Sequence, residues 1–460
     1  MVTATARRIK IDHLEHTFST NDYQDAGIMK FETRFILQRL FFIGFWLATC
    51  TGFVSDFIWE PETLGSPLRT MSQLIVDLIL VFLTICTIRK KTDIIFIVTL
   101  VTIAAISGFI VNNDSIVAWI NGLRYFFPVM FLPPILRYFW ATEYRHDLFV
   151  KSLDKQLYIF LWLQVPTVLF QFFKYGAGDY VGGTMGGWFS GILSFSIYYS
   201  SFYLLNKRID RNNILQSLYK NWTLIFLLFP TFLNETKISF ALIIVYFILL
   251  MPIDRKYIIR MTLLAPVVIL LVSIGSYFYS STVDESQGKL KLDPEFFEEY
   301  LDADLDDLDK AIDYAEKNYD ETFDVPRFAK FAIIPMVFSA LPGHNLMGFG
   351  LTLFRHGDIV KASDFFNEYD WLLQGTNPQL FGIILQLGII GTIWYILFFL
   401  SLFIIKPSLY PKRNLNMQAY FILAFIIILF YSDFWSYPNF SFIMFSFLFM
   451  SWKKDGNKVS

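Results

Sequence analysis

Long apolar runs recur along almost the whole chain, and they restrict its fold more than any other feature. Each run has about 20 residues, the length that an α-helix needs to cross the hydrocarbon core of a bilayer. Only 17% of the 460 residues are charged and 55% are hydrophobic, which excludes an ordinary soluble enzyme. We therefore predict an all-α polytopic membrane protein with about 12 transmembrane helices, at residues 36–58, 71–88, 93–111, 116–138, 155–173, 187–205, 215–234, 237–252, 257–280, 378–405, 417–433 and 437–452.

Basic residues precede the first run and follow every second run after it. The clusters include Arg7, Arg8, Arg89, Lys90, Arg137, Arg145, Lys207, Arg208, Arg255, Lys256, Lys412, Arg413, Lys453 and Lys454. Because loops rich in Lys and Arg remain in the cytoplasm, we expect both termini there. The predicted organisation is a cytoplasmic segment 1–35, helices one to nine over 36–281, an extracytoplasmic loop 282–377, helices ten to twelve over 378–452 and a cytoplasmic tail 453–460.

The triplet Glu235–Thr236–Lys237 interrupts an otherwise apolar stretch. A single helix over 215–252 would place the basic clusters on its two sides at opposite membrane faces. The topology rule instead favours a turn near Asn234, on the outer side. Lys237 then lies at an extracytoplasmic opening, either as a functional cation or as a snorkelling side chain beside Glu235.

The predicted loop 282–377 is the one long hydrophilic segment, and its two halves differ. Residues 284–327 carry sixteen acidic and five basic side chains, with apolar residues at helical spacing, so we expect amphipathic helix there. The aspartates between 304 and 309 lack the glycine and late glutamate of a calcium loop. The second half is apolar but broken by proline and glycine, which suits a segment on the outer membrane surface or over a cavity. We expect the loop to be mostly helical.

The chain shows no pattern of a metal, redox or nucleic-acid site. Cys50 and Cys86 lie within apolar runs and are interpreted as small hydrophobic residues. The formal net charge of −2 gives no indication of a nucleic-acid partner. We expect no metal and no cofactor.

A set of short motifs follows in order along the second half of the chain. Arg327 precedes Asn345-Leu346-Met347-Gly348-Phe349-Gly350; then come Thr376-Asn377-Pro378-Gln379-Leu380 and Gln386-Leu387-Gly388-Ile389-Ile390-Gly391. Earlier lie GGTMGGW at 182–188 and Thr236-Lys237-Ile238-Ser239. With the topology, over about residues 118–405, this order resembles the O-antigen polymerase and O-antigen ligase superfamily of bacterial inner-membrane glycosyltransferases, with the polymerases favoured.

The resemblance implies glycosyl transfer on the outer face of the bacterial cytoplasmic membrane. The expected function is a polysaccharide polymerase that joins undecaprenyl-pyrophosphate-linked oligosaccharide repeats of an O-antigen, capsule or exopolysaccharide. Expected partners are these carriers and membrane lipid, with a chain-length regulator and a flippase as candidates. Two positions depart from the family pattern. Thr376 stands where the family has His, and Lys237 replaces an Arg, which removes bidentate phosphate binding.

Such a reaction needs fixed cations for two phosphates at the outer membrane face. We predict that Arg124, Lys237 and Arg327 bind the pyrophosphate and stabilise the leaving group, with Glu235 orienting Lys237 and Lys330 close to Arg327. Arg124 lies within a predicted span, where an arginine is costly unless it is paired or faces a cavity. A structural pair with an acidic neighbour is the alternative for Arg124.

A general base and sugar-binding side chains are also needed. His344 and His356 are the two histidines on the predicted outer side, and His344 is the preferred base; Asp364 and Glu368 are rivals. Asn377, Tyr369 and Trp371 are the predicted sugar contacts. Other aromatic residues near the outer face could serve the same purpose or form an ordinary interfacial belt: Trp188, Phe434, Trp435 and Tyr437.

Two other functions remain open. A ligase would pass finished glycan to the lipid A core, and the absence of a histidine before Asn377 favours the polymerase over it. A lipid-linked oligosaccharide flippase would show internal repeats and a charged central pathway. The two halves of the chain show no repeat, and the charges gather at the predicted outer face.

Overall fold

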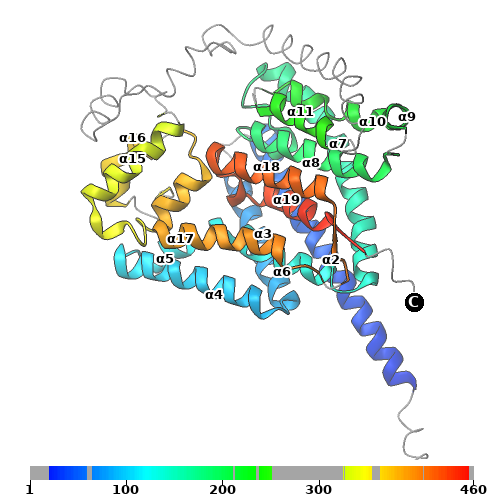
Figure 1. The fold of residues 1–460 in the computed structure, drawn as a ribbon, viewed down its shortest axis with the longest axis horizontal. Coiled ribbons are helices and arrows are strands. Elements are labelled where there is room, and N and C mark those ends of the chain that lie inside the picture. The colour runs from blue at the N-terminus through cyan, green and yellow to red at the C-terminus, as the bar shows by residue number, and fades with distance from the viewer. Residues whose placement is uncertain are drawn as a thin grey trace, which may run out of the picture.

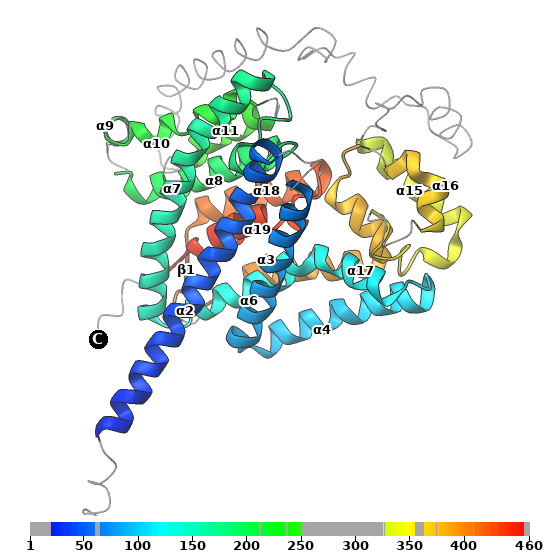
Figure 2. The same cartoon turned by 180° about the vertical axis from the view of Figure 1, so that it is seen from behind.

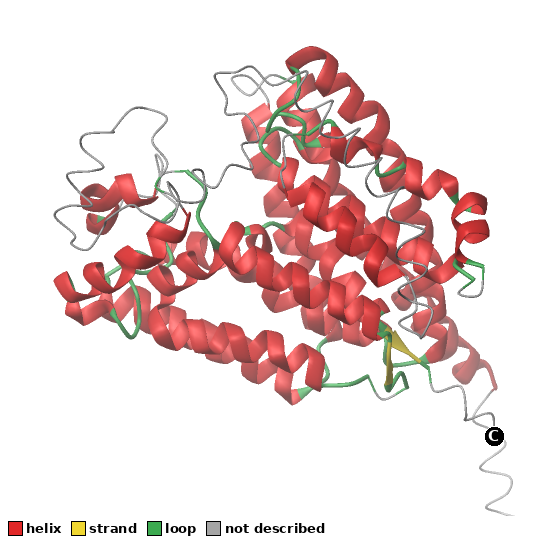
Figure 3. Ribbon diagram, turned by 45° about the horizontal axis from the view of Figure 1, so that its top comes forward, coloured by secondary structure: helices red, strands yellow, loops and turns green. Residues whose placement is uncertain are grey.

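The computed structural model describes most of the chain and shows an all-α protein (Figure 1). The described residues are 20–59, 65–210, 213–234, 238–250, 325, 327–354, 363–373, 375–407 and 409–454. Figure 3 shows one small strand pair among the helices, the antiparallel β1 (Lys412–Arg413) and β2 (Trp452–Lys453). The apolar helices agree with the expected class, an all-α membrane protein.

The helices and their bounds follow in chain order. They are α2 (Thr20–Phe53) with π-helix η1 (Val54–Ile58), α3 (Ser66–Thr87), α4 (Lys91–Ala105) with π-helix η3 (Ile106–Val111), α5 (Ile116–Leu123), η4 (Arg124–Phe126), α6 (Phe127–Phe139), α7 (Glu143–Tyr175), η5 (Gly183–Met185), α8 (Ser190–Arg208), α9 (Ile214–Lys220), α10 (Trp222–Phe226), η6 (Phe229–Phe232), α11 (Ile238–Leu250), α15 (Arg327–Ala340), η8 (Pro342–His344), α16 (Asp364–Leu373), α17 (Gln379–Ile404), α18 (Leu415–Tyr431), η9 (Phe434–Ser436) and α19 (Pro438–Met450).

Six of the described helical segments are long and apolar enough to cross a membrane. They are Phe35–Ile58, Ser66–Thr87, Lys91–Val111, Ile116–Phe139, Glu143–Tyr175 and Gln379–Ile404, and each covers an expected span. Helix α8 occupies the span expected at 187–205, and shorter apolar helices occupy three more expected spans, at α11, α18 and α19. The span expected at 215–234 is divided among α9, α10 and η6, and the one at 257–280 lies outside the described residues. The count of twelve stays a prediction.

Two helices, α8 and α19, form the centre of the bundle. Nearly every side chain from Ser190 to Leu205 and from Asn439 to Met450 is buried. Small residues allow this close packing; for example, a Cβ on Gly191 would lie 2.6 Å from the ring of Phe434. Between membrane helices such close van der Waals contact replaces the hydrophobic effect as the main attraction. Outer helices instead expose apolar side chains along one face, as α3 does with Met71, Leu74, Leu78, Phe82 and Ile85.

The helix connections gather at two ends of the bundle. At one end, the basic end, Lys454 pairs with Glu143 at 2.5 Å and His146 stacks on Tyr410 with ring centroids 4.1 Å apart. The strand pair β1–β2 lies there too. At the other end, Asp56 accepts a hydrogen bond from the backbone of Gly187 at 2.9 Å. The contacts at the basic end thus join helix connections that were predicted on the inner side. The contact between Asp56 and Gly187 joins connections that were predicted on the outer side.

A second, smaller core lies beside the bundle (Figure 2). It is built from α15, η8, α16, the turn 345–354 and the start of α17, which lie together in the yellow and orange part of both views. These segments are the described portion of the predicted loop 282–377, and they are largely helical. The acidic half of that loop, up to residue 324, lies outside the described residues. This smaller core meets the bundle at the candidate site.

Candidate active-site cavity

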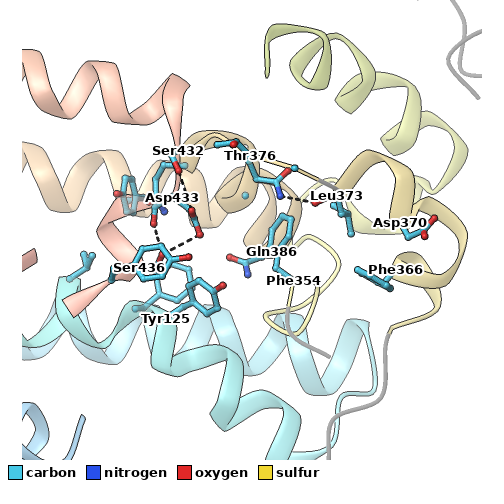
Figure 4. A pocket seen from close by; sticks show the side chains of 18 residues that line it. Tyr125, Phe354, Phe366, Asp370, Leu373, Thr376, Gln386, Ser432, Asp433 and Ser436 are labelled. Atoms are coloured by element: carbon cyan, nitrogen blue, oxygen red, sulfur yellow. Dashed lines mark hydrogen bonds between the residues drawn. The ribbon is translucent and has the colours of Figure 1, made fainter. Parts of the chain in front are cut away.

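A polar cavity of about 480 Å³ lies where the smaller core meets the bundle (Figure 4). Its volume is within the range of small-molecule sites, about 300–1,000 Å³. Six segments contribute the lining: Tyr125, Phe126, Val129, Phe354, Phe366, Asp370, Leu373, Gly375, Thr376, Asn377, Gln379, Gly382, Gln386, Tyr395, Ser432, Asp433, Ser436 and Tyr437. Seven of them belong to the predicted outer loop 282–377, and Ser436 belongs to the predicted outer connection between the last two spans. We call this end of the bundle the cavity end.

Two glycine motifs pack backbone against backbone beside the cavity, and Gln386 is their one residue among the described lining residues. Gly348 and Gly388 have φ angles of +73° and +65°, which favour glycine. A Cβ on Gly348 would lie 2.5 Å from the Leu385 carbonyl oxygen, and a Cβ on Gly388 would lie 2.4 Å from that of Leu346. The Phe349 amide donates to the Leu385 carbonyl at 2.7 Å, and the Ile389 amide donates to the Asn345 carbonyl at 3.1 Å. The motifs found in the sequence therefore dock the loop onto a break in α17.

The break in α17 directs Gln386 toward the cavity. Its side chain lines the cavity, and its Nε2 donates to the Leu351 carbonyl at 3.4 Å. Figure 4 shows its amide between Phe354 and Tyr125. Gln386 is the first residue of the quoted Gln-Leu-Gly motif, so the motif could have indicated this position.

Asp433, just after α18, brings a carboxylate to the cavity. Its two oxygens accept long hydrogen bonds of 3.4 Å from the hydroxyls of Ser432 and Ser436. The Ser436 hydroxyl also donates to the Asp433 backbone carbonyl. These contacts hold the carboxylate among cavity-lining side chains (Figure 4). Asp370, on α16, is the second lining carboxylate.

Lys330 lies behind the cavity wall. It is fully buried, and its ammonium donates to the Asn377 side-chain oxygen at 3.0 Å and to the Thr376 carbonyl at 3.3 Å. The Asn377 amide in turn donates to the Leu373 carbonyl at 2.8 Å. Lys330 therefore fixes Asn377, a predicted sugar contact that lines the cavity. Thr376, in place of the family's histidine, lines it as well.

Two predicted cations lie close to this cavity without lining it. The Arg327 guanidinium carbon is 4.3 Å from the ring centroid of Tyr431, the residue that precedes the Ser432–Asp433 pair. Arg124 precedes the lining residue Tyr125, and its Nε donates to the Asp77 carboxylate at 2.6 Å. The acidic partner considered for Arg124 is thus present. Asn377 thus lines the cavity, whereas Arg124 precedes a lining residue and Arg327 stacks on Tyr431, which precedes one.

Three other predicted residues lie in the smaller core instead. The His344 ring stacks on Phe349 with centroids 4.6 Å apart, and its buried Nδ1 has no hydrogen-bond partner among the described residues. Tyr369 and Trp371 are only 5% and 8% exposed. Burial, with Glu368 adjacent, raises the pKa of Tyr369. None of the three lines the cavity.

The remaining predicted residues divide into two groups. Glu235, Lys237, His356 and the side chain of Asp364 lie outside the described residues. Glu368 is exposed, Phe434 and Trp435 are buried, and Trp188 is 67% exposed. Tyr437 alone of the four additional aromatic candidates lines the cavity. Its ring meets that of Phe189 at 5.2 Å.

Sequence reasoning did not identify several lining residues. Asp370, Asp433, Gln379 and Tyr395 come from α16, the α18–α19 connection and two turns of α17. Tyr395 is 1% exposed, and its hydroxyl has no hydrogen-bond partner among the described residues. Asp433 is the last residue of the expected span 417–433, at its predicted outer end, and a carboxylate there was a usable signal. Tyr395 lies within an apolar run and gave none.

The described residues contain no group of three or more His, Cys, Asp or Glu side chains that could hold a metal ion. Comparisons with protein-family models and with curated proteins found no match for this chain. Functional inference therefore depends on the cavity and on the motif resemblance.

Proposed function

We propose that this protein is a polysaccharide polymerase that joins undecaprenyl-pyrophosphate-linked oligosaccharide repeats at the outer face of a bacterial inner membrane. One observation carries the proposal: a polar cavity with two carboxylates opens within an apolar helical bundle, and arginines lie beside it. Carboxylates and aromatic faces suit a sugar, and arginines suit phosphate. Ordered motifs that resemble the polymerase family line or support the same cavity.

In this proposal the acceptor sugar occupies the cavity and Asp433 is the general base. Asp433 takes the proton of the acceptor hydroxyl, whose oxygen forms a bond to the anomeric carbon of the donor sugar. The bond from that carbon to the phosphate oxygen breaks, and the pyrophosphate leaves with the electron pair. The base is assigned to Asp433 rather than His344 because Asp433 lines the cavity and His344 packs outside it.

The cations stabilise the leaving group at the edge of the cavity. Arg327 stacks on Tyr431, which precedes the lining residue Ser432, and Arg124 precedes the lining residue Tyr125, so the proposal has them approach the leaving group from two different segments. The Arg124 Nε donates to the Asp77 carboxylate. In the proposal this bond fixes the plane of the guanidinium, whose paired N–H groups bind phosphate. Lys330 acts on the substrate only through Asn377.

The test is an electrophoretic glycan profile of a strain that lacks the gene and is complemented with variants. We expect wild type to give a full ladder, and Asp433→Asn to give single repeats because base loss costs roughly 10²–10⁴ in rate. Arg327→Ala should also shorten the glycan ladder. Glu368→Gln is the control, since this carboxylate is exposed on α16 and does not line the cavity.

Protein amounts measured by immunoblot separate lost activity from lost folding. A full ladder from Asp433→Asn at normal protein level would reject the assigned base. If the deletion strain accumulates long polymer on the carrier and none on the final acceptor, the protein is a ligase. If repeats remain on the inner face, it is a flippase.

A further inference from the structure

We infer that the cavity selects an acceptor sugar without an acidic group, either an uncharged sugar or an amino sugar. The inference rests on the proposed function, because it assigns the acceptor to the cavity. It goes further by naming the chemical class of that acceptor. Three observations support it: the charge of the lining, its hydrogen-bonding groups and its aromatic faces.

Among the described residues, the lining has two carboxylates and no cationic side chain. Asp370 and Asp433 line the cavity, and no Lys, Arg or His is among its described lining residues. The Lys330 ammonium donates to the lining residues Thr376 and Asn377 and does not itself line the cavity. The Arg124 guanidinium is bonded to Asp77. A uronate placed in this cavity would meet like charges, whereas an amino sugar would meet opposite ones.

The lining also offers polar groups that suit hydroxyls. The Tyr395 hydroxyl is nearly fully buried and has no hydrogen-bond partner within the described part of the chain. A buried hydroxyl needs a hydrogen-bond partner, and at a cavity wall a sugar hydroxyl or a water can supply it. Amides at Asn377, Gln379 and Gln386 surround the same space. Each amide and hydroxyl can bind a sugar hydroxyl without demanding charge.

Aromatic rings complete the cavity. Tyr125 and Phe366 lie on different elements, α5–α6 and α16, and Tyr437 follows η9. Flat apolar faces match the C–H faces of a pyranose ring. The phosphates of the donor, by contrast, find no cation among the described lining residues, and the proposal leaves them to Arg327 and Arg124 outside the cavity. The cavity thus separates the acceptor sugar from the pyrophosphate.

The experiment measures binding to the purified full-length protein in detergent by saturation-transfer difference NMR. The probes are the methyl glycosides of glucosamine, N-acetylglucosamine and glucuronic acid at pH 7.5. We expect glucuronate to bind at least tenfold more weakly than the other two. Replacing both carboxylates, with Asp370→Asn and Asp433→Asn, should reduce that difference to less than threefold. Tyr395→Phe should weaken binding of all three.

Glucuronate binding as tight as glucosamine binding, or no binding of any probe, would overturn the inference. The same holds if Glu368→Gln changes the preference as much as the cavity substitutions do. The glycan profile described above tests transfer independently of sugar preference. A full effect of Asp433→Asn on the ladder with no charge preference would therefore reject this inference and leave the proposed function standing.

Discussion

Two arginines on one helical segment, Ile116–Phe139, lie toward opposite ends of the bundle. Arg124 lies toward the cavity end and pairs with Asp77 of α3; Arg137 lies toward the basic end and pairs with Asp93 of α4. The Arg137 and Asp93 side chains are 8% and 6% exposed, whereas those of Arg124 and Asp77 are 18% and 11% exposed. The same pair of residue types therefore occurs in a closed setting and in a more open one.

The difference shows how this fold separates structure from function. At the basic end, polar groups complete one another: Lys207 and Lys454 pair with acidic residues of α7. At the cavity end, polar side chains surround a space. An arginine in a membrane segment is expensive in both places, but in the described part of the chain the second place also adjoins a cavity that could hold a ligand. The predictions below test this contrast, from the largest expected effect to the smallest.

Replacing one partner of the closed pair should damage folding most. Arg137→Met leaves Asp93 buried without its partner, at a cost of about 3–5 kcal/mol. Arg124→Met should cost no more than about half of that, because Asp77 is more exposed and lies near a polar cavity. The measurement is the melting temperature of purified protein in detergent, with folded yield by size exclusion.

A double variant supplies the control. Arg137→Met combined with Asp93→Leu removes both charges and should recover most of the lost stability, because apolar replacement of a buried pair is often close to neutral. Equal melting temperatures for Arg124→Met and Arg137→Met would break the contrast between the two pairs. Arg124→Met should nevertheless shorten the glycan ladder, whereas the double variant should not.

The sequence was a good guide to the membrane helices and to the order of the motifs. Apolar length alone indicated six described spans to within a few residues, except at the N-terminal end of α7, which begins at Glu143 rather than near residue 155. The residues between 143 and 155 are too polar to resemble a membrane helix, yet they continue α7 outside the apolar region. Charge placement also predicted that the basic junctions share one end.

The cavity could be predicted only in part. Arg124 was singled out because charge in an apolar run is costly, and Asn377 because of its motif. Trp371 and Tyr369 were expected to meet sugar, but α16 turns both toward the smaller core. An aromatic residue in a polar loop has two faces available, and the sequence does not specify which one is buried. Tyr395 is the opposite case. It lines the cavity, but its place within an apolar run gave no sign of this.

The glycine turn provides the next test, because it builds the cavity end from backbone rather than charge. Gly348→Ala requires a non-glycine residue at φ +73° and places a Cβ against the α17 backbone. The strain alone costs about 1–3 kcal/mol. Gly343→Ala is the matched control: no atom lies within 4 Å of its Cβ position, so we expect a change within about 0.5 kcal/mol.

Thermal unfolding of the two alanine variants gives the measurement. We expect Gly348→Ala to lower the melting temperature and shorten the glycan ladder together, since Phe349 and Leu385 separate when the turn moves. Equal stability of the two variants would show that the docking of turn on helix is loose. A lower melting temperature with an unchanged glycan ladder would show that the activity does not depend on the docking of the glycine turn onto α17.

The smallest expected effect concerns Asp114, which joins the α4–α5 connection to the same glycine turn. Its Oδ1 accepts a hydrogen bond from Thr352 at 3.2 Å, and its Oδ2 is buried with no hydrogen-bond partner in the described part of the chain. Burial raises the pKa of Asp114 to about 6, and the bond from Thr352 opposes this rise. The folded protein therefore holds a proton on Asp114 more tightly than the unfolded chain, whose carboxyl titrates near 3.8.

The sign of the pH dependence follows from that difference. As pH rises from about 4 to about 6, the unfolded chain loses the proton first, so folding stability falls, and above that window the loss is constant. Asp114→Asn should match wild type near pH 4 and melt a degree or two higher above pH 6, roughly the shift expected for a partly exposed group. Thr352→Val removes the hydroxyl that lowers the pKa and should move the fall in stability to higher pH. A difference between Asp114→Asn and wild type that does not vary from pH 4 to pH 7 would show that Asp114 is ionised throughout. The cavity end would then tolerate a buried charge as well as the basic end does.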